Sequence, residues 1–150
     1  MGGLRHHDRF RLCYFIDKGN ADSFFEQLEN LNKFVRQEWI QKGNKAELYE
    51  GIETRVLIIL DNASYHKCLD VLEKIERLIP NIHLVFLPTY SPDFNLIELV
   101  WHSCKEFIAH RLFQSVQKLK ELLNKLLNKG DLLISWNRKI HNKGNNVIAN

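Results

Sequence analysis

An unbroken apolar run, Val56 to Leu60, ends directly at Asp61 and limits the folds that this chain can adopt. Such a run, rich in β-branched residues, is typical of a central strand that is covered on both faces. A second apolar run, residues 82–87, follows a segment with helical spacing, residues 67–79. Two strands joined by one helix predict a right-handed parallel crossover. We therefore expect an α/β domain in which Asp61 lies at the carboxyl end of a strand.

The rest of the chain continues this alternation of strands and helices. Residues 10–16 alternate in polarity and predict a strand. A helix is predicted to follow, capped by Asn20 or Asp22 and running to about residue 41. The polar segment between that helix and Val56 predicts a loop. Two more helices are predicted at residues 94–112 and 115–128, the second stopped by Gly130. We expect residues 1–150 to form one domain with a basic C-terminal tail at 131–150.

Composition and charge narrow the class of protein. A chain of 150 residues with 45% hydrophobic content can bury a core. The sequence has no stretch of about 18 apolar residues and no apolar signal-peptide region at its start, which predicts a cytoplasmic protein without a membrane partner. Residues 1–100 carry 12 Lys and Arg against 15 Asp and Glu, whereas residues 101–150 carry 9 against 3. The basic end is compatible with a nucleic-acid backbone as partner, although charge alone favours the simpler reading of a solvated helix face and a loose tail.

Two carboxylates are candidates for chemistry, and each has an ordinary alternative. Asp61, followed by Asn62, is placed where open α/β sheets bind ligands, but an Asp-Asn pair also forms turns. Glu98 falls at the edge of an apolar helical arc, together with His102 and Lys105. The arc comprises Ile97, Val100, Trp101, Cys104, Phe107 and Ile108. On position alone, Glu98 reads as a solvated flank whose contacts contribute only tenths of a kcal/mol.

Asp61 and Glu98 are stronger candidates for a functional site when they are considered together. The strand after Asp61 runs beside the first, and its following loop leads to the helix of Glu98, so both carboxylates are expected at one edge of the sheet. Carboxylates are ligands that Mg²⁺ or Mn²⁺ prefers, and two such ions can stabilise phosphoryl transfer. A zinc site from the pairs His66 with Cys68 and His102 with Cys104 is disfavoured, because both cysteines fall on apolar arcs and are expected in the core.

Two motifs carry a resemblance to a known family. The chain reads LDNASYHK and, later, LPTYSPDFNLIELVW, with 36 residues between Asp61 and Glu98. This pattern resembles the DDE superfamily of transposases and endonucleases, in the mariner-like branch of bacterial insertion sequences. The resemblance implies a ribonuclease H-like fold, a mixed sheet with helices on both faces, and a divalent metal, Mg²⁺ or Mn²⁺. It also implies cleavage and transfer of DNA strands by phosphoryl transfer.

The resemblance assigns roles residue by residue. Asp61 and Glu98 would be the second and third catalytic, metal-binding acids. His66 and Lys67 fit the position of the family's basic pair near the scissile phosphate and are expected to bind DNA. His102 and Lys105, on the same helix edge as Glu98, are also expected to bind DNA. Residues expected to shape the motif are Asn62, Tyr90, Ser91, Pro92, Asp93, Asn95 and Trp101.

The chain also departs from the family pattern. The family's first catalytic Asp lies within the first strand of the sheet, whereas Asp8 and Asp17 only flank the strand predicted at residues 10–16. The helix-turn-helix expected before the catalytic domain has no counterpart, and Leu96 replaces a usual proline. We therefore expect an N-terminally truncated ribonuclease H-like domain, whose strand at 10–16 would be left as an exposed edge. The alternative is an inert DNA-binding or oligomerising remnant that pairs with itself or with an intact transposase.

Overall fold

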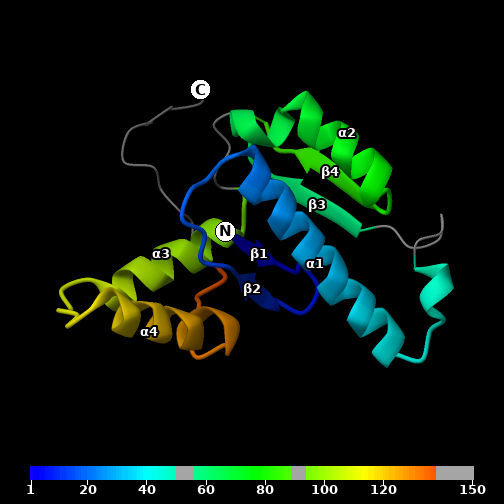
Figure 1. Cartoon of the computed structure of the whole chain (residues 1–150). Helices are drawn as coiled ribbons and strands as arrows, with labels where there is room; N and C mark the ends of the chain where they lie inside the picture. The colour runs from blue at the N-terminus through cyan, green and yellow to red at the C-terminus, as the bar shows by residue number, and fades with distance from the viewer. Residues whose placement is uncertain (50–55, 89–93, 138–150) are drawn as a thin grey trace, which may run out of the picture. The chain divides into compact units, whose positions relative to one another are not determined.

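The computed structural model describes residues 1–49, 56–88 and 94–137. The chain divides into two compact units. Unit 1 consists of Met1 and Tyr14–Tyr90, and unit 2 consists of Gly2–Cys13 and Ser91–Asn150. Asp61 thus belongs to unit 1 and Glu98 to unit 2. Figure 1 shows the helices and strands of each unit.

Unit 1 contains the predicted strand–helix–strand crossover. Strands β3 (Val56–Leu60) and β4 (Ile82–Phe86) pair in parallel, with Ile58 opposite Leu84, and helix α2 (Leu69–Leu78) connects them. Before β3 come helix α1 (Ala21–Gln41) and the short 3-10 helix η1 (Ala46–Leu48). Helix α2 begins two residues later than predicted, because residues Ser64–Lys67 form a separate 3-10 helix, η2.

The core of unit 1 forms on one side of β3 and β4. Phe24, Phe25 and Leu28 of α1 meet Val71 and Ile75 of α2, and the inward residues of both strands pack against them. The sequence predicted that β3 is covered on both faces, and this is wrong for the described residues. Its alternate side chains at positions 57 and 59 are 64% and 60% exposed. Both flanking helices pack on the same apolar cluster, which leaves the opposite face open.

Unit 2 contains two helices and a two-stranded antiparallel ribbon formed by β1 and β2. Helices α3 (Ile97–Ile108) and α4 (Val116–Asn128) share an apolar cluster that includes Val100, Cys104 and Leu126. Strand β2 (Arg11–Cys13) is shorter than the predicted strand at 10–16 and pairs antiparallel with an unpredicted strand, β1 (Gly2–Leu4). Helix α3 is shorter than predicted at both ends, and on its C-terminal side His110 adopts a positive φ of 62°. Ser115 caps α4, and Gly130 follows it with φ 83°, as its predicted stop.

Side chains from distant parts of the sequence hold the ribbon. Asn128 accepts a hydrogen bond from the Cys13 N–H at 2.7 Å and donates to the Cys13 carbonyl at 2.9 Å. Trp101 lies so close to β1 that a Cβ on Gly2 would stand 2.5 Å from its ring. Glycine is therefore required at position 2 by close approach.

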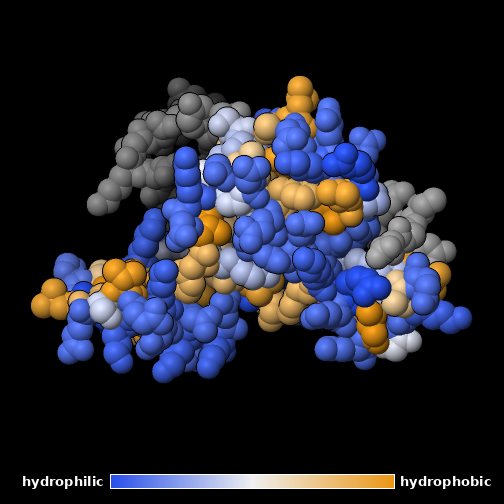
Figure 2. Space-filling view, viewed as in Figure 1, coloured by the Kyte–Doolittle hydropathy of each residue, from blue (hydrophilic) through white to orange (hydrophobic). Residues whose placement is uncertain are grey.

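Surface hydrophobicity is uneven. Figure 2 shows apolar side chains gathered at the turn between α3 and α4, where Leu112 and Val116 are 102% and 70% exposed. Within the described residues, no helix combines the length and the apolar character that crossing a bilayer demands.

Candidate active site

Asp61 follows β3 directly, at the carboxyl end of the parallel pair, where the sequence placed it. Its side chain is 64% exposed. Oδ1 accepts a hydrogen bond from the Ala63 N–H at 3.2 Å and lies 3.0 Å from Nδ1 of His66. In the part of the chain that the structure describes, both contacts use Oδ1, so Oδ2 is available to a ligand.

His66 is held against Asp61 by η2, which turns the chain back immediately after the strand. Its Nδ1 also lies 3.3 Å from the Asp61 main-chain carbonyl. The ring centroid is 4.3 Å from that of Phe24 and 4.4 Å from that of Tyr65, and the side chain is only 12% exposed. These contacts fix the imidazole so that it orients the Asp61 carboxylate. Binding of DNA by His66 stays a prediction.

Asn62 fastens the ends of the two strands. Its Nδ2 donates a hydrogen bond to the Leu87 main-chain carbonyl, and the Leu87 N–H donates to the Leu60 carbonyl at 2.8 Å. Its Oδ1 is buried without a hydrogen-bond partner among the described residues. The neighbouring Lys67 is exposed, with Nζ 5.0 Å from the centroid of the Phe86 ring. An ammonium therefore stands on the sheet end that carries Asp61.

Glu98 lies in the first turn of α3 and is half-buried. Its N–H donates to the Asn95 carbonyl at 2.9 Å, so Asn95 contributes to the start of the helix. A carboxylate in the first turn interacts favourably with the unpaired N–H groups of the helix end. The Glu98 side chain therefore lies at the N-terminal end of α3.

The other faces of α3 partly match the predicted arc. Val100 and Cys104 are buried as expected, but Phe107 is 37% exposed and the Arg111 guanidinium lies 4.1 Å from its ring centroid. Leu99, absent from the arc, is buried instead. The apolar arc was predicted from helical geometry alone, whereas burial also depends on which neighbouring elements pack against each flank of α3.

Some of the remaining predicted site residues lie within the described ranges, and others lie outside them. His102 faces Glu106, with Nε2 to Oε1 3.4 Å, and Lys105 is exposed. Trp101 packs into the apolar cluster of unit 2. The motif-shaping residues that lie outside the described residues are Tyr90, Ser91, Pro92 and Asp93. Of the basic tail at 131–150, positions 138–150 also lie outside them.

Asp8 and Asp17, the two acids on either side of the strand predicted at residues 10–16, both lie outside the described strands. Asp8 lies between β1 and β2, where Arg5 Nη2 is 2.7 Å from its Oδ2 and Phe10 N–H donates to its Oδ1. The Arg5 guanidinium holds the pKa of the Asp8 carboxyl well below its usual range. This carboxylate is already engaged within unit 2.

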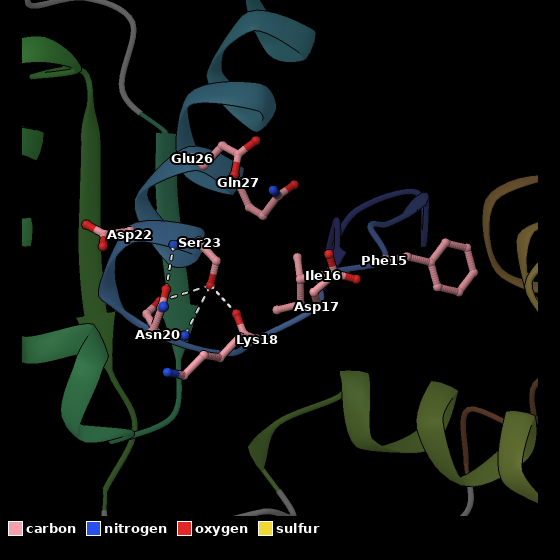
Figure 3. A pocket seen from close by; sticks show the side chains of 9 residues that line it. All are labelled: Phe15, Ile16, Asp17, Lys18, Asn20, Asp22, Ser23, Glu26 and Gln27. Atoms are coloured by element: carbon pink, nitrogen blue, oxygen red, sulfur yellow. Dashed lines mark hydrogen bonds between the residues drawn. The ribbon is translucent and has the colours of Figure 1, made fainter.

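Asp17 lines a cavity of about 460 Å³ at the beginning of α1. Figure 3 shows its lining, which includes the mutual cap of Asn20 and Ser23, where Ser23 N–H donates to Asn20 Oδ1 at 2.9 Å. Of the two candidate caps, Asn20 and Asp22, it is therefore Asn20 that caps α1. Asp17 lies between β2 and α1 and therefore outside both described elements.

A metal would need several ligands. In residues 1–49, 56–88 and 94–137, no three His, Cys, Asp or Glu side chains gather as a ligand set. The donors at Asp61 and Glu98 are carboxylate oxygens, the type that Mg²⁺ and Mn²⁺ prefer. Each of the two residues by itself offers donor atoms of this type, and Oδ2 of Asp61 is left available by its neighbours.

Comparisons with known proteins now identify the family. A family model described as "DDE superfamily endonuclease" matches residues 1–120, and the chain belongs to this family. Among curated proteins, no sequence matches the chain.

Two solved structures are similar in fold. The crystal structure of the catalytic domain of Mos1 mariner transposase matches with a TM-score of 0.58 and 23% identity, over 79% of this chain and 54% of that chain. A structure of the Mos1 transposase catalytic domain and Raltegravir with Mg matches with a TM-score of 0.58 and 25% identity, over 74% and 51%. The chain spans about half the length of these domains. The predicted ribonuclease H-like, mixed α/β fold is confirmed.

Proposed function

We propose that this chain is the C-terminal part of a transposase catalytic domain, which acts in divalent-metal-dependent cleavage and transfer of DNA strands. The observation that carries the proposal is Asp61, an exposed carboxylate at the carboxyl end of a parallel strand, in a chain of the DDE superfamily endonuclease family. One of the similar Mos1 structures contains Mg, which supports a divalent metal here.

The proposed roles follow from chemistry and placement. Asp61 and Glu98 would hold Mg²⁺ or Mn²⁺, whose charge would stabilise the attacking and leaving oxygens of a phosphodiester. His66 keeps the Asp61 carboxylate in one orientation through the 3.0 Å contact. Lys67, His102 and Lys105 would contact the DNA backbone, because cationic groups bind phosphate.

The chain alone offers two of the three acids that the family pattern uses, so we propose that it is inert or weakly active by itself. The direct test is nicking of supercoiled DNA with Mg²⁺ or Mn²⁺ by the purified chain. We expect no nicking above background. Clear nicking of the DNA by the wild-type chain, abolished in Asp61→Asn, would contradict the proposal that the chain is inert or weakly active by itself.

Metal binding tests the assigned ligands without relying on catalysis. We expect Asp61→Asn and Glu98→Gln each to weaken Mn²⁺ binding about tenfold or more in calorimetric titrations, because each removes an anionic ligand. Asp70→Asn and Glu106→Gln are matched controls, since these acids pair with Lys74 and His102. Equal losses in the control variants would show that the ions bind the acidic surface in general.

The alternative function, an inert remnant that binds DNA or oligomerises, has one observation in its favour. Residues 2–13 and 94–137 of unit 2 carry nine Lys and Arg against five Asp and Glu, whereas the described residues of unit 1 carry eight against ten. DNA binding that falls steeply with salt, unchanged in Asp61→Asn, would favour this alternative.

A further inference from the structure

Helix α4 and its C-terminal cap carry three lysines on one side of the helix. Lys118 is followed by Lys125 after seven positions and by Lys129 after eleven, and all three are exposed. Successive helical residues turn by about 100°, so the three side chains fall within about 40° of one another around the axis. With a rise of about 1.5 Å per residue, they span about 16 Å along it. We call these three residues the lysine row.

The ammonium groups of the lysine row are not neutralised by carboxylates. Within the described ranges none of them has an ion-pair partner, whereas Lys74 of α2 lies 2.7 Å from Asp70. The acid within α4 is Glu121, and its Oε1 accepts a hydrogen bond from Gln117 Nε2 at 3.4 Å. Lysines four positions apart on a helix, like the last two of the row, repel each other. An anion bound along the row would remove this repulsion.

The apolar face of α4 is already covered within unit 2. Leu126 and Leu127 are 3% and 5% exposed and belong to the cluster that includes Val100 and Cys104 of α3. A helix that binds a bilayer surface turns its apolar face into the lipid. Helix α4 would have to leave its own core to do so. An anionic membrane is therefore a poor fit to the lysine row.

A nucleic-acid backbone fits the row better. Each DNA strand carries one phosphate per about 3.4 Å of helix axis, so a row about 16 Å long can meet phosphates with all three charges. Lysine binds phosphate as a point charge, and contacts of this kind add affinity without reading sequence. Ser115 caps α4 and its leucines are buried, so the row lies on a well-supported helix.

We propose that the lysine row of α4 is a contact surface for the phosphate backbone of double-stranded DNA. The choice of DNA among polyanions rests on the proposed function, whereas the row itself rests on helix geometry and charge within unit 2. Neither metal nor cleavage enters this contact, because the ammonium groups bind phosphate directly. The surface is therefore testable in a chain that does not cut DNA.

The test measures binding of a fluorescent DNA duplex in EDTA at several salt concentrations. The row variant combines three substitutions: Lys118→Gln, Lys125→Gln and Lys129→Gln. We expect it to reduce the slope of log affinity against log salt by about two to three, since each phosphate contact contributes about 0.9. The corresponding arginine variant, with Lys118→Arg, Lys125→Arg and Lys129→Arg, should keep the wild-type slope because it keeps the charge.

A control variant removes the same charge from another part of the surface. It combines three exposed positions of unit 1: Lys33→Gln, Lys42→Gln and Lys45→Gln. We expect this variant to bind DNA with the wild-type slope. Far-UV circular dichroism confirms that each variant is folded.

The other outcomes decide against the lysine row. A wild-type chain that does not bind the duplex, or binds it without salt dependence, overturns the proposal. So does an equal loss of slope in the row and control variants, or a row variant that loses binding only to vesicles of anionic lipid. Asp61→Asn should keep the wild-type slope in EDTA, whatever it does to metal binding. If Asp61→Asn reduces the slope and the row variant does not, the lysine row is refuted while the proposed function stands.

Discussion

Units 1 and 2 hold their candidate acids in different ways. Unit 1 presents Asp61 at the end of a strand whose inner side chains join an extensive apolar core. Unit 2 presents Glu98 on a helix, and its two strands have only three residues each and depend on side chains such as Asn128. Burial of apolar side chains therefore supports the strand that carries Asp61, whereas hydrogen bonds between residues distant in the sequence also help to build the unit that carries Glu98.

The largest expected effect comes from removing matched leucines from the two cores. Leu28 of unit 1 is 0% exposed and Leu126 of unit 2 is 3% exposed. Leu28→Ala and Leu126→Ala should each lower the free energy of unfolding by about 2 to 5 kcal/mol, because each leaves a cavity. Urea unfolding measures the loss. In Leu28→Ala, amide hydrogens of β3 and β4 should exchange faster first. In Leu126→Ala, those of α4 should do so. Equal loss of protection in both units for either variant would show that the two units do not have separate cores.

A smaller effect is expected at the ribbon of unit 2. Asn128→Ala leaves the partly buried N–H and carbonyl of Cys13 without their side-chain partner. This should lower the free energy of unfolding by about 1 to 3 kcal/mol. Asn124→Ala is the control, since Asn124 contacts Asn128 but not the ribbon. If both variants unfold at the same urea concentration, Asn128 does not stabilise the ribbon in the proposed way.

The smallest effect is expected at Asp8, and it depends on pH. Because Arg5 lowers the pKa of the folded-state carboxyl below the ordinary value of 3.8, the pair stabilises the fold above that pH. The contribution is lost as the pH falls from 3.8 through the folded-state pKa. Asp8→Asn should therefore be slightly less stable than the wild-type chain at pH 7, and the gap should close in acid. A gap of equal size at both pH values in urea unfolding would contradict this origin.

Much of unit 1 could be predicted from local sequence. Helix α1 has its apolar residues at helical spacing and a cap at Asn20, and β3 is an uninterrupted apolar run that ends at Asp61. These signals act over a few residues, so they are legible without the fold. The two motifs also gave the family, because their residue types and spacing are features of the sequence itself.

Other features depend on contacts that no local pattern encodes. The β1–β2 ribbon needs Asn128, 115 positions from Cys13, and Gly2 is required only because Trp101 packs beside it. The exposure of Phe107 contradicted its helical arc, because burial depends on which neighbours reach each flank.

Residue patterns alone predicted the order of the main helices and strands, the placement of Asp61 at a strand end, and the family. The near-burial of His66 against Asp61 and the exposure of Leu57 and Ile59 on β3 became visible only in the folded structure. The physical reason is that hydrogen bonding and hydrophobic spacing within an element are set by neighbouring residues, whereas burial and side-chain pairing are set by whatever the fold brings near.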